Sequence, residues 1–200
     1  MSERTILDGK TEEYKEAYLG VAEYFEDNIP GVKTFFYSND EENPNVTYDV
    51  QWYKDVEAFN DQLQVLTCPM DEELEVLTQT MLSLTTVKGV VFGDYPQSFV
   101  DFANKAGAKF DFLTPAAGFI RESADGQEGP PVIFYTTRYV LEGHQEDYTT
   151  AWQVFSDYLK ENSSGTIAHT MAFDNEDPTL IHNFFAYSNL EVVDEILSDN

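Results

Sequence analysis

The amino-acid sequence predicts an α+β protein that contains two copies of one β-α-β-β-α unit. When the chain is compared with itself at an offset of 134 residues, RTILDGKTEEYKEAY at 4–18 aligns with RYVLEGHQEDYTTAW at 138–152. The same offset aligns SNDEENPNVTY at 38–48 with AFDNEDPTLIH at 172–182. In both copies the apolar residues follow first the period of a helix and then that of strands. Because neither copy can bury its apolar face alone, we expect the two copies to pack against each other.

The first copy begins with a short strand at 4–7 and a helix at 11–28, which Pro30 and Gly31 end. The expected buried face of this helix consists of residues three or four positions apart: Tyr14, Ala17, Tyr18, Val21 and Phe25. The elements expected next are a strand at 32–38, an acidic hairpin loop at 39–45, a strand at 46–53 and a short helix at about 54–63. Only three residues precede Arg4, so either the first strand is short or the true N-terminus lies upstream.

The second copy repeats this order. Its expected elements are a strand at 132–141, a helix at 145–161, a strand at 166–173, a loop through Pro178, a strand at 180–187 and a short helix at about 190–197. The expected buried face of the long helix is formed by aromatic residues and one alanine: Tyr148, Ala151, Trp152, Phe155 and Tyr158.

A further segment separates the two copies. We expect a helix at 71–84, a strand at 87–92, a helix at 96–106 and a strand at 109–113 that leads into PAAGFIR at 115–121. The stretch ESADGQEGPP is acidic and rich in Gly and Pro, as linkers are. The predicted organisation is a first repeat at 1–66, a central helix and β-α-β segment at 67–121, a linker at 122–131 and a second repeat at 132–200.

The net charge of the chain excludes two classes of partner. Its 37 acidic and 11 basic residues give a formal charge of −26, which repels nucleic-acid backbones and anionic membranes. No stretch approaches the roughly 20 apolar residues of a membrane span, and the polar start MSERTILDGKTEEY lacks the apolar core of a signal peptide. The single Cys68 excludes a disulfide framework. We therefore expect a cytoplasmic protein.

Four features of the repeat carry a resemblance to a known family. The β-α-β-β-α order, PG after the first helix, DEENPN in the hairpin and QWYKDVEAF at 51–59 resemble the antibiotic biosynthesis monooxygenase (ABM) family. Its members are ferredoxin-like modules that pair into a dimeric α/β barrel. The resemblance covers roughly two-thirds of the chain and implies that the barrel forms within one chain, with the central segment bracing it. The family includes cofactor-independent oxygenases and haem-degrading enzymes.

The haem-degrading members pair a strand-end Trp with an Asn on the first strand and a His shortly after the Trp. Trp52 matches the first of these positions, but the second copy has Ala186 there. Neither expected first strand contains an Asn, and no His follows Trp52 before His144. Haem degradation is therefore disfavoured, and we expect no cofactor.

His169 and His182 are the candidate catalytic residues. If the second hairpin folds symmetrically about Asn175 and Glu176, the two imidazoles become cross-strand neighbours on an otherwise apolar face. One interpretation is a general base with its partner, or two metal ligands. The other is that both rings replace the aromatic pair of the first copy and hydrogen-bond locally. The sequence leaves both open, and because no third ligand is near, we expect no metal.

The candidate substrate-binding residues are mostly aromatic. Trp52 and Tyr48 share one strand parity and, with Phe35, predict an aromatic wall. The family resemblance places this wall toward the cavity, where Phe184 of the second copy would extend it; ordinary core packing of these rings is the alternative. Arg121 would orient a carboxylate or an enolate, or pair with an acidic side chain.

Two functions fit these residues. The first is a cofactor-independent oxygenase whose pocket takes a small hydrophobic molecule, either aromatic or enolisable, with a His as the base. The alternative is a non-catalytic small-molecule-binding or stress-related protein of the same fold, because the two copies differ at the candidate positions. Either protein would be a monomer or a homodimer.

Overall fold

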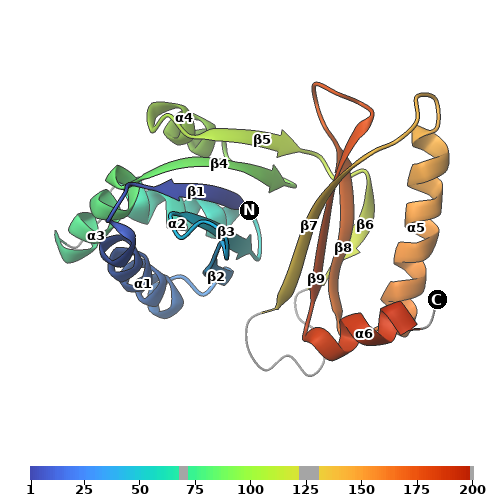
Figure 1. Cartoon of the computed structure of the whole chain (residues 1–200), viewed down its shortest axis with the longest axis horizontal. Helices are drawn as coiled ribbons and strands as arrows, with labels where there is room; N and C mark the ends of the chain where they lie inside the picture. The colour runs from blue at the N-terminus through green and yellow to red at the C-terminus, as the bar shows by residue number, and fades with distance from the viewer. Residues whose placement is uncertain (68–71, 122–130, 199–200) are drawn as a thin grey trace. The chain divides into compact units, whose positions relative to one another are not determined.

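The computed structural model describes residues 1–67, 72–121 and 131–198 (Figure 1). The chain divides into two compact units, Met1–Asp111 and Phe112–Asn200. Both units combine helices with antiparallel strands, so the predicted α+β class is confirmed. Cys68 and all of the predicted linker except Pro131 lie outside the described residues.

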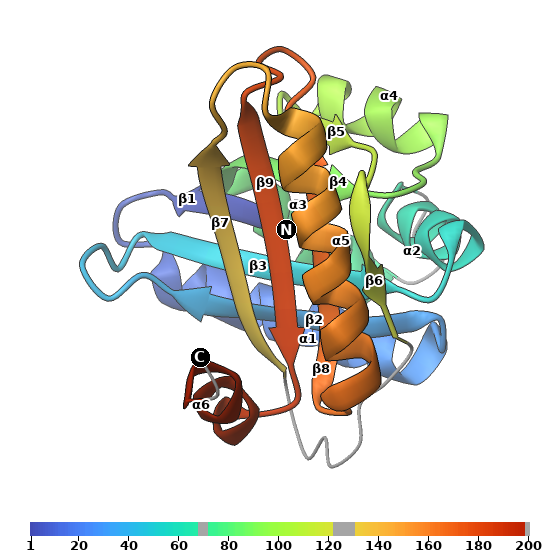
Figure 2. The same cartoon turned by 90° about the vertical axis from the view of Figure 1, so that its right-hand side faces the viewer.

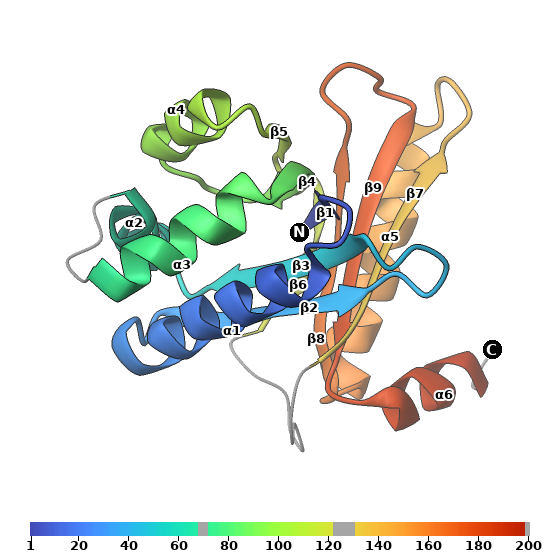
Figure 3. The same ribbon diagram turned by 60° about the vertical axis from the view of Figure 1, so that its left-hand side comes forward.

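Unit 1 contains a sheet of five strands among its described residues, in the order β2-β3-β1-β4-β5. Its elements are β1 (Ser2–Ile6), α1 (Thr11–Asn28), β2 (Val32–Asn39), β3 (Val46–Tyr53), α2 (Val56–Thr67), α3 (Glu72–Ser83), β4 (Thr85–Phe92), α4 (Gln97–Lys105) and β5 (Lys109–Leu113). The order β2-β3-β1-β4, with α1 and a second helix as the connections, is the ferredoxin-like arrangement. Figure 3 shows α1 and α3 running alongside each other, and the two helices are in contact.

Unit 2 contains a sheet of four described strands in the order β6-β8-β9-β7. Its elements are β6 (Ala117–Ile120), β7 (Val132–Tyr139), α5 (Gln145–Asn162), β8 (Thr166–Phe173), β9 (Leu180–Tyr187) and α6 (Leu190–Ser198). The order β8-β9-β7 matches β2-β3-β1 of unit 1, so both predicted copies fold as β-α-β-β-α. Figure 2 shows α5 lying along the sheet, where it contacts β6 and β8.

The segment predicted between the two copies is divided between the units. Strands β4 and β5 extend the sheet of unit 1, whereas β6 pairs with β8 in unit 2. The sequence did not predict β6 as a strand, because a four-residue segment with a central glycine has little strand character of its own. Its pairing partner decides its conformation. The predicted barrel depends on how the two units pack, and it stays a prediction.

The buried face of α1 is the predicted one: Tyr14, Ala17, Tyr18, Val21 and Phe25 are all buried. The prediction for α5 was wrong in part. Trp152 is buried, but Phe155 is 40% exposed and Tyr158 is 55% exposed, and the other buried residues of this helix are Ser156 and Leu159. The two buried faces differ because the helices have different neighbours: α3 packs along α1, whereas α5 packs against β6 and β8.

Gly31 and Gly165 occupy equivalent positions and allow the following helix to approach closely. A Cβ atom on Gly31 would lie 2.2 Å from the Cβ of Ala58, and one on Gly165 would lie 2.4 Å from a methyl group of Val192. Ala58 lies on α2 and Val192 lies on α6. The glycine that both copies share is therefore required by packing rather than by an unusual backbone conformation.

We expect Gly31→Ala to lower the free energy of unfolding by about 1–3 kcal/mol, because the added methyl group overpacks the contact with α2. Urea denaturation of the wild type and the variant measures this change. The double variant Gly31→Ala/Ala58→Gly removes the opposing methyl group and should recover part of the loss. A single variant as stable as the wild type would show that α2 does not pack against this turn.

Candidate active site

The two candidate histidines lie on opposite faces of the sheet of unit 2. In the β8–β9 pairing, His169 lies opposite Phe185 and His182 lies opposite Ala172. The prediction that the two rings are cross-strand neighbours was therefore wrong. The hairpin loop is the cause. Asp174 and Leu180 close it, with the Asp174 N–H donating to the Leu180 carbonyl at 2.9 Å, so its centre falls beyond Asn175 and Glu176. This shift reverses the face on which one of the histidines lies.

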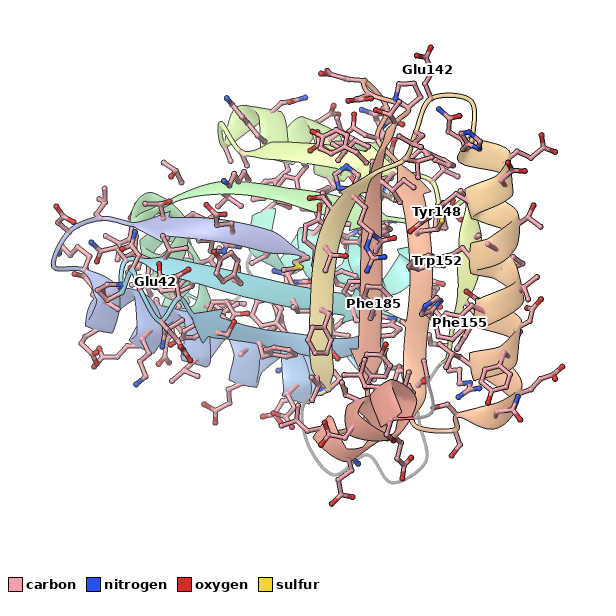
Figure 4. All side chains as sticks on the ribbon, turned by 45° about the vertical axis from the view of Figure 1, so that its right-hand side comes forward. Glu42, Glu142, Tyr148, Trp152, Phe155 and Phe185 are labelled. Atoms are coloured by element: carbon pink, nitrogen blue, oxygen red, sulfur yellow. The ribbon has the colours of Figure 1, made fainter. Side chains whose placement is uncertain are left out.

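His169 lies in the core beneath α5 and is 1% exposed. Its Nδ1 is 2.7 Å from the Ser156 hydroxyl oxygen, and its ring stacks on Trp152 with 4.4 Å between the ring centres. Phe185 also contacts the ring, and Figure 4 shows Trp152 and Phe155 on the side of α5 that faces the strands. Burial lowers the pKa of His169 to about 4. A neutral, enclosed imidazole of this kind supports the structural interpretation of His169.

His182 lies on the other face of the sheet, in a chain of three polar side chains. Its Nε2 is 3.0 Å from Oδ2 of Asp174, and its Nδ1 is 2.5 Å from the hydroxyl oxygen of Tyr135 on β7. Tyr135 and His182 also stack, with 6.0 Å between the ring centres. The chain thus joins one residue from β7, one from β9 and one from the hairpin loop.

Electrostatics fix the direction of these hydrogen bonds. The backbone N–H groups of Asp177 and Glu176 donate to the Asp174 carboxylate and, together with His182, hold the pKa of Asp174 below its ordinary value. Asp174 is therefore ionised at neutral pH and can only accept, so Nε2 of His182 carries the ring proton. Nδ1 of the neutral ring is then the acceptor for the Tyr135 hydroxyl. This is the arrangement of a general base that a carboxylate orients.

The equivalent hairpin of unit 1 has the same loop geometry but a different side chain. Asp40 accepts hydrogen bonds from the backbone N–H groups of Glu42 and Asn43, as Asp174 does in unit 2. Its Oδ2 accepts a hydrogen bond of 3.1 Å from the hydroxyl of Tyr48, which stands where unit 2 has His182. The position equivalent to Tyr135 is Met1. The Tyr-His-Asp chain is therefore a feature of unit 2 that unit 1 does not repeat.

The predicted aromatic wall does not form on one face. Phe35 lies in the core of unit 1, stacked on Tyr18 with 4.8 Å between the ring centres. Tyr48 and Trp52 lie opposite Ser38 and Thr34 and so occupy the other face of the sheet. The prediction that Phe35 joins Tyr48 and Trp52 was wrong, because the first hairpin has the same shifted register as the second.

Phe184 lies directly opposite Tyr135 in the β7–β9 pairing, so it shares the face of the Tyr-His-Asp chain.

Arg121, predicted to orient a substrate, instead bonds backbone carbonyls of unit 2. Its guanidinium donates to the carbonyl groups of Lys160, Ser163 and Thr166, and it lies over the Phe119 ring. The carbonyls of Lys160 and Ser163 are at the C-terminal end of α5, where a cation is favourable, and that of Thr166 belongs to the first residue of β8. Arg121 therefore caps a helix, and its hydrogen-bond partners among the described residues are carbonyls rather than acidic side chains.

Two residues of the candidate site, Tyr135 and Asp174, were not predicted from the sequence. Asp174 had a signal, because the alignment of the two copies places it on Asp40 in an equivalent loop. No sequence pattern pointed to Tyr135, since only the pairing of β7 with β9 brings it to His182.

Within residues 1–67, 72–121 and 131–198, no group of three or more His, Cys, Asp and Glu side chains is placed to hold a metal ion. A surface depression of about 590 Å³ lies on α3 of unit 1 and is lined by Glu72, Glu73, Val76 and Leu77.

The fold and the site define an α+β protein of ferredoxin-like type in which one unit carries a hydrogen-bonded Tyr-His-Asp chain. No model of a known protein family matches the sequence, and no curated protein matches it. In the part of the chain that the structure describes, no helix is long and apolar enough to cross a membrane.

Solved structures resemble this fold. One is a putative monooxygenase from Lactobacillus acidophilus NCFM, which is 12% identical with a TM-score of 0.58; the match covers 96% of this chain and 78% of that one. Another is a putative monooxygenase from Fusobacterium nucleatum subsp. nucleatum ATCC 25586, which is 13% identical with the same TM-score; the match covers 96% of this chain and 76% of that one. The predicted resemblance to monooxygenase-like proteins is thus confirmed for the fold.

Proposed function

We propose that this protein is a cofactor-independent monooxygenase that acts on a small aromatic or enolisable molecule. The observation that carries the proposal is the chain from Tyr135 through His182 to Asp174, with separations of 2.5 and 3.0 Å. The solved structures of similar fold agree with this class of activity through their names. Phe184 and Tyr135 provide apolar ring surface on the same face of the sheet, where an aromatic substrate would lie.

Each member of the chain has a role in removing a proton from the substrate. His182 is buried, whereas Tyr135 is partly exposed, so the Tyr135 oxygen is the atom that meets the substrate. As this oxygen takes a proton from the substrate, it passes its own proton to Nδ1 of His182. Asp174 then stabilises the imidazolium through Nε2.

The carbanion that results would react with molecular oxygen as the co-reactant. A C–O bond forms, oxygen is reduced to a peroxide, and the proton on His182 returns through Tyr135 to give a hydroperoxide. Loss of water then leaves a carbonyl group on the substrate. One oxygen atom ends in the product and the other in water, so a CH₂ group and O₂ give C=O and H₂O. In this scheme the Tyr-His-Asp chain supplies only proton transfer and the orientation of the imidazole.

Oxygen uptake in the presence of anthrone, an enolisable aromatic ketone, tests the proposal. We expect His182→Gln to lower the rate about 10²- to 10⁴-fold, because removal of a general base costs that much. His182→Tyr restores the residue of unit 1 and should be equally inactive, since a tyrosine can still hydrogen-bond Asp174 but is no base at neutral pH. The control is His144→Gln, at an exposed histidine before α5. Uptake that is unchanged in both His182 variants would contradict the assignment of the base.

A second candidate function is non-catalytic binding of the same class of small molecule. The similarity of the two hairpins favours it, because Asp40 and Tyr48 make the equivalent hydrogen bond without a base. In this case aromatic ligands would raise the melting temperature, while no oxygen would be consumed. Thermal-shift measurement with anthrone and with substituted hydroquinones, run beside the uptake assay, separates the two functions.

A further inference from the structure

A buried ion pair lies in the core of unit 1, and its residues take no part in the Tyr-His-Asp chain. The Nε atom of Arg4 on β1 donates to Oδ2 of Asp49 on β3, and the Ser2 hydroxyl is 3.4 Å from the same oxygen. Arg4 is 6% exposed and Asp49 is fully buried. Burial raises the pKa of Asp49, and the guanidinium of Arg4 opposes this rise. The pair is thus electrically neutral as a unit and closed off from bulk water.

Several polar atoms around this pair lack a hydrogen bond. Among the described residues, no partner is found for Nη1 of Arg4, Oδ1 of Asp49 or the hydroxyl of Tyr18. The hydroxyl of Tyr14 is near that of Thr47, but neither forms a hydrogen bond of normal geometry there. All five side chains are at least nine-tenths buried. Asp49 lies opposite Tyr37 in the β2–β3 pairing, and the Tyr37 ring contacts the rings of Tyr14 and Tyr18, with 6.0 and 4.7 Å between the ring centres, so these groups lie on one face of the sheet beneath α1.

A dry cluster of this kind would be costly. Each buried polar group without a partner costs about 1–3 kcal/mol, and natural proteins pair about nine-tenths or more of such groups. Buried water commonly supplies the missing bonds, each molecule contacting about two to four polar atoms. The cluster needs an acceptor for Arg4 and a donor for Asp49, and water is both. An anion would be repelled by Asp49 and a cation by Arg4, so a neutral occupant fits best.

We propose that Arg4, Asp49, Tyr14 and Tyr18 enclose a binding site for ordered water beneath α1. The water bridges Nη1 of Arg4 to the tyrosine hydroxyls and donates to Oδ1 of Asp49. This site joins α1 to β1 and β3, so it contributes to the stability of unit 1 rather than to the chemistry at His182.

The second copy lacks the groups that would build this site. Asn183 replaces Asp49, and its amide is directed to Thr136 at 3.3 Å. Trp152 replaces Tyr18 and stacks on His169. Arg138, the counterpart of Arg4, is exposed. The hydrated cluster therefore distinguishes the core of unit 1 from that of unit 2.

The first test is the pair of variants Tyr18→Phe and Tyr139→Phe, compared by urea denaturation. If water binds the Tyr18 hydroxyl, its removal loses a hydrogen bond, and the unfolding equilibrium constant should rise about two- to tenfold. Tyr139 is 75% exposed and serves as the control, for which no change is expected. If Tyr18→Phe is neutral or more stable than the wild type, the hydroxyl was unpaired and the proposal fails.

A crystal structure at about 1.5 Å resolution is the second test, because it separates water from a direct contact that a destabilised variant alone would also fit. We expect a density peak of one water within hydrogen-bond distance of both Arg4 and Tyr18. Side chains that have moved to pair directly with one another, an empty interior, or density for an organic molecule would each overturn the proposal.

Discussion

Asp49→Asn should lower the free energy of unfolding by about 3–5 kcal/mol, because it leaves the buried guanidinium of Arg4 without its counter-ion. The substitution preserves the size of the side chain and matches Asn183 of the second copy, so lost packing cannot account for the result. Arg4 and Asp49 are both more than nine-tenths buried, which is why the cost far exceeds that of a surface ion pair. Urea denaturation at neutral pH measures the change.

Two further variants give this experiment its controls. Arg4→Met/Asp49→Leu removes both charges and should regain much of the stability lost by the single variant, since apolar pairs often replace buried ion pairs at little cost. Lys88→Met breaks the exposed pair with Glu3 and should change stability by no more than about 1 kcal/mol. A double variant that is less stable than Asp49→Asn would show that the unpaired charge is not the source of the loss.

The second large effect is a loss of stability in acid that His169 causes. Its pKa is lowered to about 4 in the folded protein from an ordinary value of 6.5, so between these pH values the unfolded chain binds a proton that the folded chain does not. The free energy of unfolding should therefore fall as the pH drops from about 6.5 to about 4, by about 3 kcal/mol in all. Above pH 7 this contribution is fully present.

The double variant Ser156→Ala/His169→Phe isolates this effect. The two new side chains are those that unit 1 has at the aligned positions, where Ala22 matches Ser156 and Phe35 matches His169. The variant therefore replaces one natural pair of side chains by another. Urea denaturation between pH 4 and pH 8 should show a flatter pH dependence for the variant than for the wild type. His144→Gln, at an exposed histidine, should keep the wild-type slope. Equal slopes for wild type and double variant would mean that His169 has the same pKa in the folded and the unfolded protein.

The element order of both units could be predicted from the sequence, because local patterns determine the individual elements. The predicted helix at 11–28 agrees with α1 at both ends, since Thr11 and the Pro30-Gly31 pair mark them in the sequence. The strands of both hairpins were likewise predicted to within a residue or so. The buried face of α1 followed from helical spacing alone.

The candidate site could be predicted only in part. Spacing and composition singled out His182, but they paired it with His169 through a symmetric hairpin that does not form. Hydrogen bonds inside the loop set the true register, and a shift of this kind changes which face a side chain occupies. Tyr135 could not be predicted from the sequence, because it lies on another strand, 47 positions from His182.

The sequence by itself determined the β-α-β-β-α order of both units and the apolar side of α1, since these depend on periodicity and on residues close together in the chain. Only the tertiary structure decided that His169 is enclosed beneath α5 while His182 joins Tyr135 and Asp174 on the opposite face. The physical reason is that these contacts depend on strand register and on which element covers which face. Both are set by hydrogen bonds and packing between segments that are distant in the sequence.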